Sequence, residues 1–182
     1  MVYMNKRLPL VRSLIEKIKE PLLAILAALL ISSFIMSHTQ VPTESMRPTI
    51  SPGDHLIVNR LPYYYREPKS GEIVVFDYKG KNLIKRIIGI PGDTIDILEG
   101  SVYVNGERLD ESMYLGKHNE TFTFSKSPIT FPYKVPEGTY FVLGDNRRNS
   151  SDSRVIGPIS STSIIAKAGY RIYPIGDIGL VR

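Results

Sequence analysis

"EIVVFDYKGKNLIKRIIGI", residues 72–90, holds two runs that are rich in β-branched and aromatic residues, at 72–78 and 82–90. Runs of this kind, bounded by turn residues, are typical of β-strands. Asn105-Gly106, between two further apolar runs within 101–109, is the strongest short-range signal for a β-hairpin. The same criteria predict strands at 55–60, 94–98, 139–145 and 163–173. The sequence therefore predicts a mainly antiparallel β fold.

Two polar stretches interrupt this pattern of strands. Residues 62–72, "PYYYREPKSGE", are punctuated by Pro and Gly and predict a loop. Residues 110–135 are polar, interrupted by Pro and rich in Ser and Thr, which favours an excursion over the surface. The chain has 182 residues, the size of one ordinary domain with room for a small subdomain. We place that subdomain, which contains the excursion, at about residues 96–135.

The net charge of +5 is concentrated at the amino terminus. Residues 1–20 carry five basic and two acidic side chains, whereas a nucleic-acid binder would carry its basic excess on the folded domain. Nucleic acid is therefore not an expected partner. The absence of Cys excludes disulfides and thiolate metal sites, and His, Asp and Glu do not cluster at metal-ligand spacing. We therefore expect no metal.

The run "PLLAILAALLISSFIM", residues 21–36, is apolar on every side of a helix, and no charged residue occurs between Glu20 and Glu44. Extended to His38, the helix would be roughly 27 Å long, close to the ~30 Å of a bilayer's hydrocarbon core. Three interpretations are open: a retained transmembrane anchor, a cleaved signal peptide and a buried core helix. The length and the basic flank favour the anchor.

The anchor interpretation predicts the topology of the chain. Residues 1–20 would be a basic cytoplasmic tail, because a basic flank is held on the cytoplasmic side of a membrane. Residues 21–38 would be the single span, and residues 39–182 an extracytoplasmic domain. The chain is thus expected in the plasma membrane, with the lipid bilayer as a partner.

The loop "TESMRPTI", residues 43–50, places Ser45 shortly after the apolar run. A single loop serine is more often a turn or cap residue than a nucleophile. A serine nucleophile usually needs a base, and none of the histidines, His38, His55 and His118, has a carboxylate at a spacing that suggests a catalytic triad. Lysine is the residue type that remains.

Lys85 lies between apolar residues of the strand predicted at 82–90, although a strand lysine usually points to solvent. A free lysine has a pKa of ~10.4, so it is protonated at neutral pH and cannot act as a base. Burial without a carboxylate partner disfavours the ammonium form and can lower the pKa by several units. A pKa of about 8 would allow Lys85 to accept a proton from Ser45.

Four stretches resemble, in order and spacing, the successive sequence boxes of bacterial type I signal peptidase. They are "PTESMRPTI" (42–50), "GDHLIVNR" (53–60), "KRIIGIPGD" (85–93) and "GDNRRNSSDSR" (144–154). The likeness runs from Pro21 onward, and "VYVNGE" (102–107) resembles the hairpin of that family. It implies a β-barrel or sandwich of twisted sheets behind one amino-terminal transmembrane helix. It also implies a membrane-bound serine endopeptidase, without a cofactor, that removes signal peptides from secreted preproteins after small residues (Ala-x-Ala).

The resemblance assigns roles to single residues. Ser45 matches the nucleophile and Lys85 the general base. The Thr43 hydroxyl and the backbone N–H of Ser45 match the oxyanion hole, and Ser150 would hydrogen-bond the lysine amine. Two ion pairs would brace the site without touching the amine: Asp152 with Arg154, and Asp145 with Arg86.

The substrate is expected to bind as an extended strand beside residues 83–86 and 41–44, with alternate side chains in pockets. Five apolar residues are candidates for the walls of shallow pockets that admit only small side chains, and any of them could be plain core instead. They are Val41, Met46, Ile50, Leu56 and Ile84.

Three alternatives stay open. A self-cleaving repressor protease shares the Ser/Lys chemistry, but it would carry a DNA-binding domain where this chain has its apolar run. A mitochondrial inner-membrane peptidase would look similar. A membrane-tethered β binding module, in which Ser45 and Lys85 are incidental, belongs to a different class. The expected partners are signal-peptide-bearing preproteins, and a monomer is expected.

Overall fold

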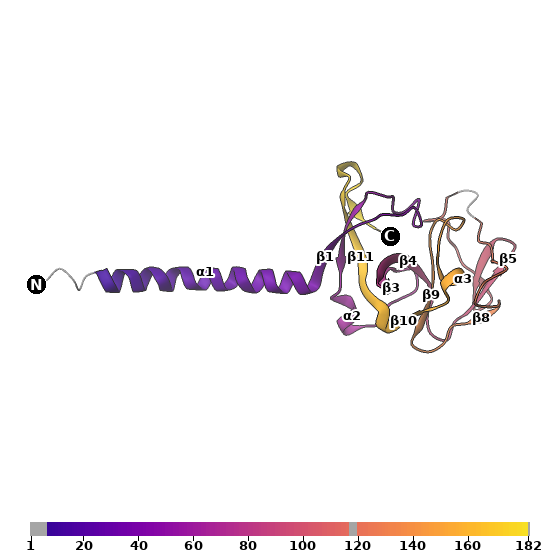
Figure 1. The fold of residues 1–182 in the computed structure, drawn as a ribbon, viewed down its shortest axis with the longest axis horizontal. Coiled ribbons are helices and arrows are strands. Elements are labelled where there is room, and N and C mark those ends of the chain that lie inside the picture. The colour runs from indigo at the N-terminus through magenta and orange to yellow at the C-terminus, as the bar shows by residue number, and fades with distance from the viewer. Residues whose placement is uncertain (1–6, 117–119, 182) are drawn as a thin grey trace, which may run out of the picture. The chain divides into compact units, whose positions relative to one another are not determined.

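The computed structural model describes residues 7–116 and 120–181. These residues divide into two compact units, one that ends at Met36 and one that begins at Ser37. Figure 1 shows a long helix in the first unit and a β domain in the second.

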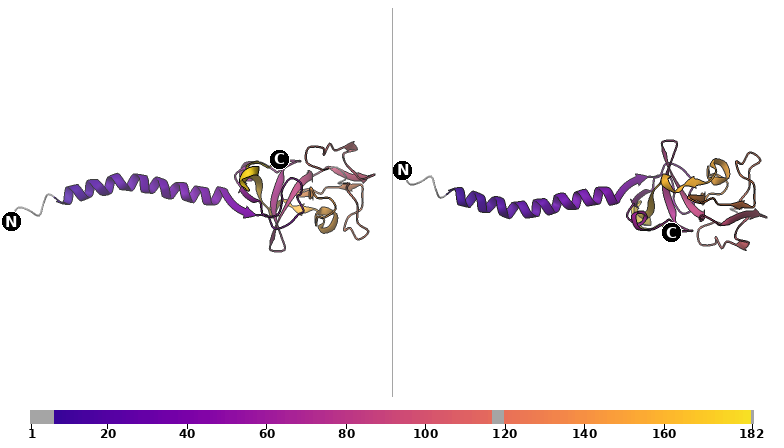
Figure 2. Two further views of the ribbon diagram at one scale, coloured as in Figure 1. Left: turned by 90° about the horizontal axis from the view of Figure 1, so that it is seen from above. Right: turned by 90° about the horizontal axis from the view of Figure 1, so that it is seen from below.

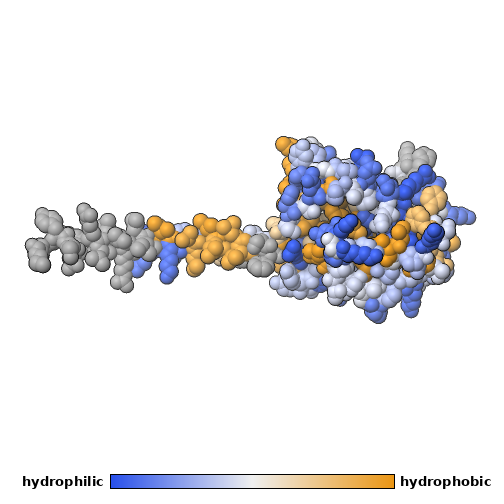
Figure 3. All heavy atoms as spheres, viewed as in Figure 1, coloured by the Kyte–Doolittle hydropathy of each residue, from blue (hydrophilic) through white to orange (hydrophobic). Residues whose placement is uncertain are grey.

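The first unit contains helix α1 (Arg7–Ile35), which has Pro21 in its interior. Figure 3 shows apolar residues along the described part of this helix. Over the described residues, no helix combines the length and the apolar character that a membrane crossing requires. The helix ends earlier than the predicted span of 21–38, because residues 36–38 belong to strand β1 (Met36–Gln40), which neighbours β2 in a sheet.

The β domain contains two sheets in the described part of the chain. In the larger sheet the strands lie in the order β1-β2-β11-β3-β4-β9-β10, and β12 pairs with β11. The bounds of these strands are β2 (His55–Asn59), β3 (Ile73–Tyr78), β4 (Lys81–Gly89), β9 (Thr139–Leu143), β10 (Ile159–Ser160), β11 (Ile164–Tyr173) and β12 (Gly179–Leu180). The smaller sheet has the order β7-β6-β5-β8, with β5 (Thr94–Leu98), β6 (Ser101–Val104), β7 (Glu107–Arg108) and β8 (Tyr133–Lys134).

The prediction of a mainly antiparallel β fold is confirmed. The pairings between β2, β3, β4, β9 and β11 are all antiparallel. Every run predicted as a strand overlaps an observed strand, and the run 101–109 contains two, β6 and β7. The predicted hairpin forms at Asn105-Gly106, which joins β6 to β7. Both turn residues have positive φ (55° and 85°), the left-handed conformation that a tight two-residue hairpin turn requires and that Asn and Gly adopt at least cost.

Several short elements differ from the sequence prediction. Residues 62–72, predicted as a loop, begin with the one-turn helix α2 (Pro62–Tyr65), since Pro is well suited to the first helical position. The strands β1, β8, β10 and β12 were not predicted. The other short helices are α3 (Ser153–Ile156), η1 (Ser161–Ser163) and η2 (Ile175–Asp177).

The excursion at residues 110–135 has little regular structure. Its described residues contain only strand β8. Figure 1 and Figure 2 show the smaller sheet, with β5 and β8, at one end of the β domain. An apolar cluster joins the two sheets there, because Ile88 of β4 and Phe141 of β9 pack with Ile95 of β5 and Val102 of β6. This packing fixes the smaller sheet against the strand that carries Lys85.

Candidate active site

Ser45 lies in a turn between β1 and β2. The backbone of this turn is closed by hydrogen bonds from Arg47 N to Glu44 O (3.1 Å) and from Ile50 N to Met46 O (2.9 Å). The Met46 and Ile50 side chains are buried and anchor the turn in the core. Ser45 itself is 8% exposed, so its hydroxyl lies at the edge of the protein interior.

Lys85 lies on β4, opposite Val74 of β3. From Ile84 to Gly89 every residue of β4 is buried, because both faces of this strand are covered. A side chain on either face therefore points into the protein. Lys85 is 3% exposed, which is rare for lysine unless the amine has partners.

The Lys85 amine and the Ser45 hydroxyl are in direct contact. Lys85 Nζ lies 2.7 Å from Ser45 Oγ and donates a second hydrogen bond to Ile84 O at 2.8 Å. Thr43 Oγ1 is 3.3 Å from Ser45 Oγ. The fold thus brings together three of the residues to which the sequence resemblance assigned chemistry, two of them 40 positions apart.

Burial lowers the pKa of Lys85 to about 8, whereas the charges of Asp152 and Asp145 act in the opposite direction. Both carboxylates are held by arginines, and neither is among the hydrogen-bond partners of the amine. Near neutral pH a useful fraction of the amine is therefore uncharged. A neutral amine within hydrogen-bond distance of a hydroxyl can accept its proton.

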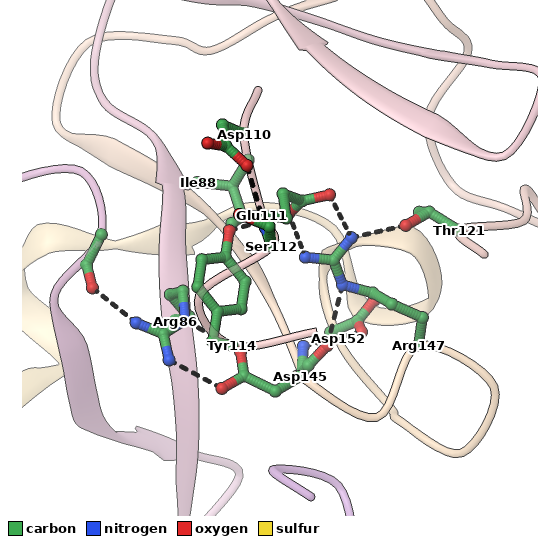
Figure 4. Close-up of polar contacts among 12 residues, drawn as sticks. Arg86, Ile88, Asp110, Glu111, Ser112, Tyr114, Thr121, Asp145, Arg147 and Asp152 are labelled. Carbon is green, nitrogen blue, oxygen red and sulfur yellow. Dashed lines mark hydrogen bonds and ion pairs between the residues drawn. The ribbon is translucent and has the colours of Figure 1, made fainter. Parts of the chain in front are cut away.

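The two predicted ion pairs are confirmed. Arg86 contacts Asp145 through Nε (2.9 Å) and Nη2 (2.7 Å), as Figure 4 shows, and its Nη1 donates to Gly71 O at 3.0 Å. Arg154 contacts Asp152 through Nε and Nη2, both at 2.8 Å. All four side chains are buried, so each charge is compensated within the protein.

Gly144 contacts several of the groups around Ser45 and Lys85, the pair of residues called the dyad below. Its N–H donates to Asp152 Oδ2 (3.1 Å), and its carbonyl accepts from Arg147 Nε (3.0 Å). A Cβ on Gly144 would lie 2.2 Å from Ser150 Oγ and 2.4 Å from the backbone oxygen of Ser45. Only a glycine fits between these two groups.

The hydrogen bond predicted from Ser150 to the Lys85 amine was wrong. Ser150 Oγ is buried and has no hydrogen-bond partner in the described part of the chain. Lys85 Nζ bonds Ser45 and Ile84 instead, and Ser150 packs against Gly144.

The five predicted pocket residues lie in one apolar cluster. Met46, Ile50 and Leu56 have almost no exposed surface, so core packing accounts for these three. Val41 and Ile84 keep a small exposed area and are adjacent in sequence to the loop and the strand that carry the dyad.

The two described histidines, His38 and His55, contact each other rather than Ser45 or Lys85. His38 Nε2 lies 2.7 Å from His55 Nδ1, and His118 is outside the described residues. Within the described ranges, no three His, Asp or Glu side chains are placed to hold a metal ion.

A second set of polar residues near the dyad was not predicted. Arg147 is buried and forms an ion pair with Glu111 of the excursion, and Tyr114 lies on the guanidinium of Arg86. Thr49 also donates to the Asp145 carboxylate. No signal in the sequence indicated this set, because Glu111 and Tyr114 lie in the stretch predicted as a surface excursion.

A serine hydroxyl in contact with a buried, weakly basic lysine is an arrangement suited to acyl transfer, which makes the molecule a candidate serine hydrolase. Comparisons with known proteins define its family. The model of the family described as "Signal peptidase, peptidase S26" matches residues 14–173. The chain therefore belongs to this family, and it is a hydrolase of the signal peptidase class.

Named relatives agree with this assignment. A protein named probable signal peptidase I-2, from Synechocystis sp., is 36% identical, and the match covers 97% of this chain and 81% of the relative. Signal peptidase I of Bacillus licheniformis is 37% identical, with 91% of this chain and 92% of the relative covered. The solved structure of a signal peptidase I from Enterococcus faecalis V583 is 34% identical and covers 56% of this chain and 97% of that one, with a TM-score of 0.48.

Proposed function

We propose that this chain is a membrane-bound serine endopeptidase that removes signal peptides from secreted preproteins after small residues of the Ala-x-Ala type. One observation carries the proposal: the 2.7 Å contact between Lys85 Nζ and Ser45 Oγ in a buried setting. Membership of the signal peptidase family supports the choice of substrate.

In the proposed mechanism, neutral Lys85 takes the proton of Ser45 as Oγ attacks the carbonyl carbon of the scissile bond. The negative charge on the carbonyl oxygen is stabilised by the Ser45 N–H and the Thr43 hydroxyl, which act as the oxyanion hole. As the tetrahedral intermediate collapses, the Lys85 ammonium returns the proton to the leaving amine. Neutral Lys85 then activates a water that hydrolyses the acyl ester on Ser45.

Five residues have supporting roles in this proposal. They hold the residues around Ser45 and Lys85 in place: Ser150 packs against Gly144, Asp145 pairs with Arg86, and Asp152 pairs with Arg154. The buried ion pairs are suited to this, because each carboxylate is neutralised by its own arginine and raises the pKa of Lys85 less than a free charge would.

The substrate would lie as an extended strand beside residues 83–86 and 41–44. Val41 and Ile84 are the pocket residues that we retain, since they flank the dyad and keep some exposed surface. A shallow apolar pocket admits Ala and excludes larger side chains, which accounts for a preference for small residues.

The proposed topology has a cytoplasmic tail at 1–20, an anchor at 21–38 in the plasma membrane and an extracytoplasmic catalytic domain at 39–182, with a subdomain at about 96–135. Its support is the uncharged run between Glu20 and Glu44 and its basic flank. Ser45 follows this run closely, so a cleavage site just beyond a substrate's own apolar segment would meet it at the same depth. The enzyme is proposed to act as a monomer.

The test uses the full chain in detergent micelles and a precursor peptide with an Ala-x-Ala site. Ser45→Ala and Lys85→Ala should each lower cleavage by at least about 1,000-fold, because each removes a group that makes or breaks a bond. Circular dichroism checks that both variants stay folded. A binding module would not cleave the peptide, and substantial turnover by folded Lys85→Ala would exclude the dyad.

A further inference from the structure

The excursion places polar side chains against the loop at residues 144–154. Glu111 accepts hydrogen bonds from both terminal nitrogens of Arg147, and Thr121 accepts a further one. Arg147 is 1% exposed and Glu111 9%, so this ion pair is buried. Figure 4 shows the two side chains facing each other, with Tyr114 beside them.

Arg147 connects this carboxylate to the dyad. Its Nε donates to the carbonyl of Gly144 at 3.0 Å, on the opposite side of the guanidinium from the excursion. Gly144 in turn is packed against the backbone oxygen of Ser45 and the hydroxyl of Ser150 so closely that no Cβ would fit. A displacement of the Arg147 guanidinium is therefore transmitted to the residues around Ser45.

Tyr114 provides a second connection from the same segment. Its ring lies 3.9 Å from the Arg86 guanidinium carbon, and its hydroxyl donates to Glu111 at 2.8 Å. Arg86 follows Lys85 on β4 and holds Asp145, the residue after Gly144. The Glu111 carboxylate thus contacts two residues that lead to the dyad: Arg147, which bonds Gly144, and Tyr114, which lies on Arg86.

We propose that Glu111 and Arg147 are a positioning pair, through which the excursion holds Gly144 and so keeps Ser45 in contact with Lys85. The inference rests on the proposed function of the dyad. Neither residue touches the reacting atoms, so their effect is on geometry and on the exclusion of water from Lys85. Removal of the Glu111 charge takes away the carboxylate that accepts from both terminal nitrogens of the buried Arg147, and the loop relieves this loss by moving towards solvent.

The experiment measures cleavage of the Ala-x-Ala precursor peptide by the full chain and by Glu111→Gln, which keeps the shape of the side chain. We expect kcat to fall by about tenfold or more, because small displacements of reacting groups are costly, while KM changes by less than about twofold. Added water around Lys85, which faces the charges of Asp145 and Asp152, should move the acid limb of the pH–rate profile upward.

The matched control is Glu120→Gln. Glu120 and Arg148 join the same two segments at 3.7 Å, but both side chains are well exposed. This variant should keep the kcat and the pH profile of the parent, since exposed pairs contribute little.

The double variant Glu111→Gln/Arg147→Gln covers the case in which Glu111→Gln does not fold, because it removes both charges of this buried ion pair. It should fold and still show the lower kcat and the shifted profile. A folded variant of either kind with the parent's kcat and pH profile would overturn the proposal, as would a loss of activity that only follows the folded fraction, with an unchanged profile. A parent that Ser45→Ala does not inactivate would instead refute the proposed function.

Discussion

The hairpin of β3 and β4 and the excursion at residues 110–135 both contribute buried polar groups to one site, by different means. The hairpin buries Lys85 on a strand that is buried at every residue from Ile84 to Gly89, where isoleucines flank the two charged residues, so the burial follows from local sequence. The excursion has little regular structure, and its Glu111 is buried in an ion pair with Arg147, which lies in a loop that is distant in sequence. Hydrophobic burial sets the pKa of Lys85 in the first region, whereas charge compensation holds the second region in place.

The largest difference between the two regions should appear in stability. Phe76→Ala in β3 removes a fully buried ring and should lower the free energy of unfolding by about 3–5 kcal/mol. Met113→Ala in the excursion should change it by less than about 0.5 kcal/mol, because Met113 is 86% exposed. Chemical denaturation of both variants measures this contrast. Equal losses would mean that the excursion is as tightly packed as the sheet.

Gly144→Ala should disturb the contacts through which the excursion, by way of Arg147, reaches Ser45. The added methyl group would overlap Ser150 Oγ and the backbone oxygen of Ser45, and the backbone cannot yield as a flexible side chain would. We expect cleavage of the precursor peptide to fall by about 100-fold, as for a displacement of reacting groups by about 1 Å.

Gly176→Ala is the control for this substitution, because the added methyl group would meet no atom within 4 Å. It should retain the parent's activity. A fully active Gly144→Ala variant would show that the loop can move without disturbing the dyad.

The pH dependence tests the contribution of the hairpin alone. Burial holds the pKa of Lys85 at about 8, so the neutral base predominates above that pH and the ammonium below it. The rate should therefore rise about tenfold per pH unit up to about 8 and then level off. A pH–rate profile of the full chain measures this. A profile that is flat down to pH 6 would mean that Lys85 does not act as the base.

From the sequence, the long strands and the hairpin at Asn105-Gly106 could be predicted, because β-branched runs and turn residues act locally. Strand β1 could not be predicted. Its sequence, "MSHTQ", begins with the last residue of the apolar run and is otherwise polar, which favours the end of a helix. The two-residue strands β8, β10 and β12 carry too little pattern to be recognised. The pairing of β8 also depends on β5, a strand that is distant in sequence.

For the site, sequence boxes were sufficient to select Ser45, Lys85 and the partners of both predicted ion pairs. The sequence boxes did not predict that Glu111 belongs to the site. Glu111 lies 36 positions from Arg147, in a stretch whose composition is typical of polar surface. The boxes also misjudged Ser150, because a hydrogen bond depends on tenths of an ångström that spacing does not encode.

Asn146 connects the turn that carries Ser45 to a much later part of the chain. Its backbone N–H donates to Ser45 O (3.0 Å) and its side-chain amide donates to Glu44 O (3.2 Å). A growing polypeptide therefore emerges from the ribosome with Ser45 about a hundred residues ahead of the asparagine that completes the hydrogen bonding of its turn. In the proposed function, the nucleophile would thus gain these two hydrogen bonds only late in the chain's own translation, and a product truncated before Asn146 would lack both.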